Sequence, residues 1–243
     1  AGDDFATWRG SSSPGSFFPG RLDILTTQRD DRRVLFDTLL AARGIDPAPL
    51  LRESGIEPAS LLEPGARVPI AHYAALYNAI GQALDDEAFA LFSTPMRCGS
   101  FEFLCRSIIS SRTLEEALQR SARFLRMVLP DLRVAVSRGR GRARMEIRET
   151  QRLRAQAGDP CRVFAFEWLL RLLHGLASWL VGRGLSLNAV AFPYPRPEHV
   201  ADYALIFTAH SSFDAPSLVA ELNDNLLDLP IRRDEAALSA FLQ

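Results

Sequence analysis

The chain has 243 residues, 47% of them hydrophobic, and a formal net charge of −1. This length and apolar content suffice for the core of one large domain, and the near-zero charge excludes a uniformly basic polyanion binder. No apolar run reaches the ~18 residues of a membrane span, and residues 1–20 are too polar for a secretory signal. We therefore expect a cytoplasmic protein that does not associate with membranes.

The N-terminal half predicts a series of helices. Residues 1–20 are rich in Gly, Ser and Pro and are expected to form a flexible tail. Beyond the tail, apolar residues recur at spacings of three and four, which is the helical repeat. The helices are expected at 32–42, 47–54, 58–62, 69–84, 87–93 and 101–110.

The central part of the chain predicts a helix followed by a β-hairpin. Thr113 and Glu116 have the spacing of a capping box, and apolar residues continue at helical spacing to residue 128. Pro130 ends this helix. Apolar and polar residues then alternate over 132–136 and 143–147, on either side of a Gly-Arg-Gly turn at 139–141, which is typical of a hairpin.

The C-terminal part predicts a long helix and more short strands. The helix is expected at 162–181, followed by a strand at 187–192 that Pro193 must end, because proline cannot donate to a sheet. A helical patch at 200–207, a strand at 218–222 and an amphipathic helix within 232–243 complete the chain. This order predicts an α+β fold, a helix-rich domain with a small, mainly antiparallel sheet.

Arginines crowd the expected hairpin and its exit. An arginine-rich surface suits phosphate recognition, because the guanidinium fork matches phosphate oxygens. The alternative is a solvent-exposed face whose charges block pairing with other sheet edges. We favour the solvent face, because the arginines alternate with apolar residues and no aromatic residues lie between them. The arginines are Arg133, Arg138, Arg140, Arg142, Arg144, Arg148, Arg152 and Arg154.

No metal, cofactor or catalytic motif stands out. The three cysteines have no CxxC or Cys/His spacing of a zinc site, and the four histidines have no metal-ligand spacing. Gly-x-Ser-x-Gly, Gly-x-Gly-x-x-Gly and Walker A sequences are also absent. We therefore predict neither an enzyme nor a cofactor. The alternative is a haem- or metal-dependent sensor or enzyme that uses His174 or His210.

The expected long helix carries the main candidate ligand-binding residues. Glu167 and Arg171 are four residues apart and can pair on one face, which His174 continues and Trp168 adjoins. These groups form either an ordinary surface ion pair or the polar lining of an effector pocket. Arg97, Phe101 and Arg106, around the turn at Gly99, are a candidate second wall of such a pocket.

Several motifs together resemble a known family. They are Pro193 and Pro195, Tyr203 and Phe207, the Phe-Asp-Ala-Pro stretch at 213–216 and the Leu-Leu-Asp-Leu-Pro stretch at 226–230. Upstream, Arg-Val-Pro-Ile at 67–70, Gly-Ser-Phe at 99–101 and 110–118 agree in order and spacing. Together they resemble the effector-binding, arabinose-binding-type N-terminal domain of AraC/XylS-family transcription regulators, over residues 34–242.

The resemblance implies a function. It implies a bacterial regulatory domain at 21–231 that binds a small-molecule effector and forms a homodimer. Residues 232–243 would then begin a linker helix to a C-terminal helix-turn-helix domain, through which alone the protein would contact DNA. The apolar side of this helix is expected to need a partner. A dimerisation module without a ligand is the remaining alternative.

Overall fold

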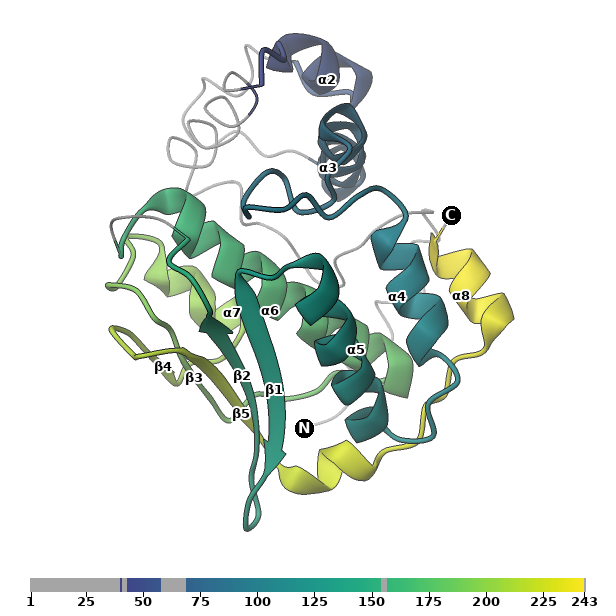
Figure 1. Cartoon of the computed structure of the whole chain (residues 1–243), viewed down its shortest axis with the longest axis vertical. Coiled ribbons are helices and arrows are strands. Elements are labelled where there is room, and N and C mark those ends of the chain that lie inside the picture. The colour runs from purple at the N-terminus through teal and green to yellow at the C-terminus, as the bar shows by residue number, and fades with distance from the viewer. Residues whose placement is uncertain (1–39, 41–42, 58–68, 154–156, 243) are drawn as a thin grey trace.

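The computed structural model describes residues 40, 43–57, 69–153 and 157–242 (Figure 1). The expected tail at 1–20 and helix at 58–62 lie outside these residues, as does the 32–42 helix except for Leu40. The described part forms an α+β fold, as predicted. Its α-helices are α2 (Pro47–Glu53), α3 (Ile70–Leu84), α4 (Ser100–Ile108), α5 (Leu114–Val128), α6 (Pro160–Val181), α7 (Tyr203–Ile206) and α8 (Glu235–Leu242).

The sheet has five strands and is mainly antiparallel, as predicted. The strands are β1 (Leu132–Arg138), β2 (Ala143–Glu149), β3 (Ala189–Ala191), β4 (Ser211–Ser212) and β5 (Leu218–Leu222). Their order is β1-β2-β5-β3-β4, and only β3 and β4 are parallel. The β1–β2 hairpin pairs Val134 with Ile147 and Val136 with Met145, so the alternating apolar residues share one face.

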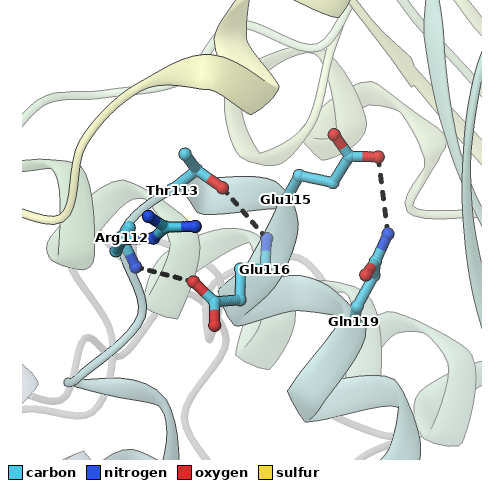
Figure 2. Close-up of a pocket in the computed structure, with 5 residues that line it drawn as sticks. All are labelled: Arg112, Thr113, Glu115, Glu116 and Gln119. Carbon is cyan, nitrogen blue, oxygen red and sulfur yellow. Dashed lines mark hydrogen bonds between the residues drawn. The ribbon is translucent and has the colours of Figure 1, made fainter.

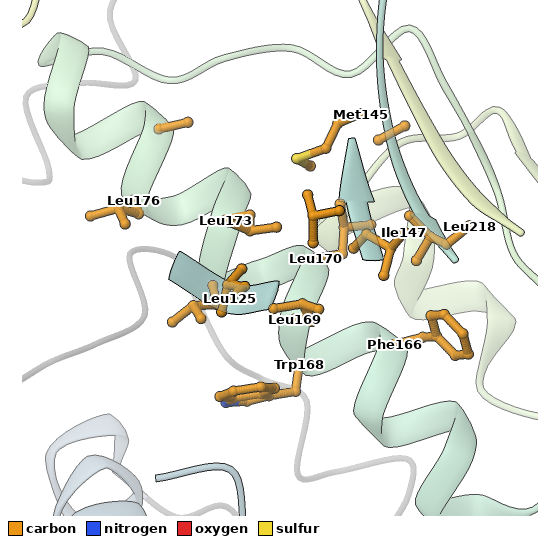
Figure 3. Packing of buried hydrophobic residues seen from close by; sticks show 14 of the residues in the cluster. Leu125, Met145, Ile147, Phe166, Trp168, Leu169, Leu170, Leu173, Leu176 and Leu218 are labelled. Carbon is orange, nitrogen blue, oxygen red and sulfur yellow. The ribbon is translucent and has the colours of Figure 1, made fainter. Parts of the chain in front are cut away.

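Helix α6 is the centre of the core. Asp159 caps its first amides, Pro160 occupies its first turn, and Gly182 ends it with a left-handed φ of 71°. Figure 3 shows its leucines lying against Leu125 of α5 and against Met145, Ile147 and Leu218 of the sheet. Within the described chain, α6 is the one helix long and apolar enough to cross a membrane. Of its most apolar 18-residue stretch, 78% is buried inside the fold.

The cap of α5 matches the prediction in part. The Thr113 hydroxyl accepts a hydrogen bond from the Glu116 amide at 3.3 Å, as in a capping box. The Glu116 carboxylate, however, accepts from the amide of Arg112 at 2.8 Å rather than from that of Thr113. The Glu116 carboxylate thus binds an amide just before the helix in either arrangement, and α5 begins where predicted.

The prediction of a helix at 87–93 is wrong, because this stretch forms turns and bends. The buried Asp86 carboxylate accepts hydrogen bonds from the amides of Ala88, Ala90 and Met96 at 2.8–2.9 Å. Phe89 and Ala90 have left-handed φ angles of 58° and 56°, which a right-handed helix does not allow. The side chain of Asp86 therefore takes the amides that would otherwise begin a helix.

Helix α8 packs within the domain, beside α4 (Figure 1). Leu238 is fully buried, and the ring of Phe241 stacks on that of Trp179 with centroids 4.4 Å apart. The backbone before α8 is tied to α6, because Arg232 N–H donates to the Leu180 carbonyl at 2.8 Å. The apolar side of α8 thus finds its partners in the same chain, contrary to the expectation that it would need another.

Candidate functional site

The candidate site is a buried group of polar side chains around Glu167, here called the Glu167 cluster: Glu167, Arg171, Tyr194, His199 and Tyr203. The carboxylate of Glu167 is 1% exposed, and three donors surround it. Its Oε1 accepts from His199 Nε2 at 2.6 Å and from the Tyr203 hydroxyl at 2.5 Å. Its Oε2 accepts from Arg171 Nη2 at 3.1 Å. Residues of α6 thus meet the segment that follows β3.

The two tyrosines extend this hydrogen-bond chain. Burial, and then the charge of Glu167, raise the pKa of Tyr203 and that of Tyr194 far above the usual value, so both phenols stay protonated. The Tyr203 hydroxyl donates its hydrogen bond to Glu167 and therefore accepts one from the Tyr194 hydroxyl, whose oxygen lies 3.0 Å away. The chain of donors runs in one direction, from Tyr194 through Tyr203 to Glu167.

Arg171 is the incompletely paired member of the cluster. Its side chain is 7% exposed, and its guanidinium carbon lies 5.6 Å from the centroid of the Phe207 ring. Its Nε is buried and has no hydrogen-bond partner among the described residues. An unsatisfied buried donor costs about 1–3 kcal/mol, so Arg171 retains capacity for an acceptor that the described chain does not supply.

Aromatic rings position the segment that covers Arg171. Phe192 lies between β3 and the Pro-Tyr-Pro turn, and four rings surround it. Their centroids lie 4.8–5.7 Å away and belong to Tyr194, Tyr203, Phe207 and Phe213. Rings from residues 192–213 therefore assemble into one aromatic wall beside the Glu167 cluster.

The other candidate residues on α6 point elsewhere. Trp168 packs against Phe89 and Phe92, with ring centroids 6.1 and 6.0 Å away. His174 donates from Nε2 to the carbonyl of Leu185 at 2.7 Å. Of the four α6 candidates, only Glu167 and Arg171 contact each other among the described hydrogen bonds. Their role in ligand binding stays a prediction.

The candidates around Gly99 form a separate group. Arg97 pairs with Asp85 at 2.5 Å, Arg106 pairs with Glu102 and with Glu235 of α8, and Phe101 lies against Phe241. The side chains of Arg97 and Arg106 are 67% and 44% exposed. Among the described contacts, Glu167 binds residues of the 194–207 segment, and none joins Glu167 or Arg171 to the turn at Gly99. The ligand-binding role of Arg97, Phe101 and Arg106 remains a prediction.

Tyr194, His199 and Tyr203 were missed as site residues by the sequence analysis. Tyr203 had a signal, since it belongs to the family motif, but nothing in the motif points to Glu167 as its partner. His199 lies 32 residues from Glu167 in the sequence, and its role depends on how the turn after β3 folds back onto α6.

The pH dependence of stability tests the buried state of His174. Burial lowers the pKa of His174, so the native ring stays neutral while the unfolded ring gains a proton below about pH 6.5. The unfolded state then binds more protons, and stability falls as the pH drops from about 6.5 toward the lowered native pKa. In denaturant titrations, His174→Gln should lose less stability than the wild type on acidification, by up to about 1.4 kcal/mol per pH unit. Equal losses in both proteins would contradict the neutral buried ring.

Metal and haem binding gain no support from the described histidines. Among the described residues, no group of three or more His, Cys, Asp or Glu side chains could hold a metal ion. The Nε2 of His174 is already used by Leu185, and His210 lies exposed in the loop before β4.

A surface pocket at the start of α5 has polar walls that already satisfy one another (Figure 2). Glu116 binds the Arg112 amide and Arg120, while Glu115 binds Gln119 and Arg138. These groups fix the beginning of α5 and its contact with the hairpin. We therefore assign the pocket no ligand.

Four of the hairpin arginines form ion pairs on a solvent-exposed face, and Arg154 lies outside the described residues. Arg138 binds both Glu115 and Asp228, and Arg142 and Arg144 bind Glu221. Arg148 binds Glu146 at 2.7 Å. With these guanidinium groups paired to carboxylates, this face supports the solvent-face interpretation over phosphate recognition.

The class of protein follows from comparison with known families. Residues 44–231 match the model of the arabinose-binding domain of AraC transcription regulators, at the N-terminus of those proteins. The chain belongs to this family, and is thus a regulatory, effector-binding domain of the AraC type. The resemblance found in the sequence motifs is confirmed.

Individual relatives are also transcription regulators. The chain is 25% identical over 194 residues to the ornithine utilization regulator of Pseudomonas aeruginosa, covering 79% of this chain and 56% of that protein. A solved structure, the transcriptional regulator CdpR from Pseudomonas aeruginosa, is similar over 86% of this chain and 60% of that one, with 20% identity and a TM-score of 0.47. The chain thus spans little more than half the length of these regulators.

Proposed function

We propose that this chain is the sensor of a bacterial transcription regulator, and that a small-molecule effector binds at the Glu167 cluster. The observation that carries the proposal is the buried Nε of Arg171, which has no acceptor among the described residues. Family membership supports an effector, and the aromatic wall around Phe192 supplies apolar surface of the kind that small-molecule sites use.

The remaining parts of the proposal concern the whole regulator. In it, an attached DNA-binding domain contacts the promoter, the protein acts in the cytoplasm, and effector binding biases the DNA-binding domain between two states. A homodimer suits such a regulator, because paired half-sites in DNA match a two-fold protein.

A thermal-shift screen tests the sensor function. The panel should contain amino acids, including L-ornithine because of the relative's name, together with sugars and organic acids. A true effector at a hundred times its Kd stabilises the native state by about 2.7 kcal/mol, which raises the melting temperature measurably. If no metabolite of a broad panel shifts the melting temperature, the ligand-free dimerisation module becomes the better interpretation.

Light scattering tests the dimer. We expect a mass of twice the 26.9 kDa of one chain at micromolar concentration. A mass that stays at that of one chain over the accessible concentration range would contradict dimerisation by this domain. The apolar residues of α8 are not the expected contact, because Leu238 is already buried within the domain.

A further inference from the structure

The guanidinium of Arg171 pairs with Glu167 through one hydrogen bond where two are possible. The Nε–H and one Nη2–H of a guanidinium lie on the same edge and can bind both oxygens of a carboxylate. Here Nη2 donates to Oε2 of Glu167, while Nε has no partner among the described residues. The other oxygen, Oε1, is already taken by His199 and Tyr203. The segment after β3 thus holds the oxygen that would otherwise complete the Arg171 pair.

The buried Nε of Arg171 requires a hydrogen-bond acceptor, and the charges around it limit which molecules can supply that acceptor. Glu167 and Arg171 form a neutral pair, and their side chains are 1% and 7% exposed. His199, which also contacts Glu167, adds no charge in its neutral form. With a neutral His199, a simple anion bound to Nε leaves one uncompensated negative charge in this buried place, which is strongly unfavourable. A molecule that carries both a carboxylate and an ammonium group keeps the sum at zero.

We propose that the effector is a small zwitterion. Its carboxylate accepts from Nε of Arg171, and its ammonium donates to Oε1 of Glu167 in place of His199 and Tyr203. This inference rests on the proposed function and names the ligand class of the same site. The ring of Phe207, beside the guanidinium of Arg171, provides an apolar contact for the carbon chain between the two charged groups.

Binding requires the covering segment to move. This segment runs through the 3-10 helix η4 (Val200–Asp202) and through α7, which have three and four residues. Such short helices have little stability of their own, so contacts with α6 hold them in place. Two of these contacts are the hydrogen bonds to Glu167 that the ammonium group replaces, and the outer side of the segment is open, with Leu205 87% exposed. We therefore expect the effector to enter the site when η4 and α7 move away from α6.

A matched set of five-carbon compounds tests the ligand class by calorimetric titration. L-Norvaline and 5-aminopentanoate carry both charges, pentanoate carries the carboxylate alone, and pentylamine carries the ammonium alone. At least one zwitterion should bind at concentrations up to about 10 mM, about tenfold or more tighter than either singly charged compound. Equal binding of pentanoate or pentylamine, or no binding of either zwitterion, overturns the proposal.

Variants of the two anchoring residues locate the site. Arg171→Lys keeps the positive charge but removes the Nε donor, and should weaken zwitterion binding about tenfold or more. Glu167→Gln removes the charge that the ammonium needs and should also weaken binding while leaving the amide able to bond. The control is Arg120→Lys, which alters a similar i, i+4 pair with Glu116 on α5, and should bind as the wild type does. Circular dichroism establishes that each variant is folded.

The outcomes separate this inference from the proposed function. An uncharged effector found in the broad screen, whose binding is unchanged in folded Arg171→Lys, would leave the sensor function standing and refute the zwitterion. The absence of any effector in that screen would refute both. Zwitterion binding that both Arg171→Lys and Glu167→Gln weaken, with Arg120→Lys unaffected, establishes the inference.

Discussion

Replacing Arg162 by methionine is expected to lower the free energy of unfolding by about 3–5 kcal/mol, because it leaves a partly buried carboxylate without its partner. Arg162 donates from Nε and Nη2 to the two oxygens of Glu149, at 2.9 and 2.7 Å. Its Nη1 donates to the carbonyls of Ala157 and Pro193, at 3.0 and 2.5 Å. One side chain thus ties β2, the start of α6 and the Pro-Tyr-Pro turn together.

Chemical denaturation measures this effect, with Arg144→Met as the matched control. Arg144 also pairs with a glutamate, Glu221 at 2.9 Å, but its side chain is 61% exposed whereas that of Arg162 is 7% exposed. Exposed pairs contribute about 0–1 kcal/mol, so the control should lose little stability. Similar losses in both variants would show that burial does not set the strength of the Arg162 contact. A double variant with Glu149→Gln should lose less than the sum of the two single changes.

Replacing Phe192 by alanine is expected to cost about 3–5 kcal/mol, the loss typical of a large aromatic side chain deleted from a core. Phe192 is fully buried and lies among the rings of the aromatic wall. Neighbouring rings are too rigid to fill the space that a phenyl group leaves, so most of the cavity should persist. The same change should loosen the segment that carries Tyr203.

Leu205→Ala is the control for this prediction. Leu205 belongs to the same segment but is 87% exposed, so its removal should change the free energy of unfolding by less than about 0.5 kcal/mol. Denaturation of both variants under the same conditions gives the comparison. A loss below about 1 kcal/mol for Phe192→Ala would mean that the aromatic wall collapses onto the cavity rather than supporting the fold.

Local signals in the sequence determined most of the secondary structure. Apolar periodicity predicts α5, α6 and the β1–β2 hairpin. Thr113, Pro160 and Gly182 mark helix ends, because they act on the backbone of their immediate neighbours. The same reasoning failed at 87–93, because the side chain of Asp86 binds amides up to ten residues away. Periodicity contains no information about such a competitor.

The sequence determined which residue types form the candidate site. The tertiary structure decided which of these residues contact one another. Spacing alone paired Glu167 with Arg171, because residues four apart face each other on a helix. Burial of that pair, and its contact with His199 and Tyr203 rather than with the turn at Gly99, depend on how the segment after β3 folds back over α6. Contacts over such sequence distances are set by the packing of the whole core, and short-range patterns do not specify them.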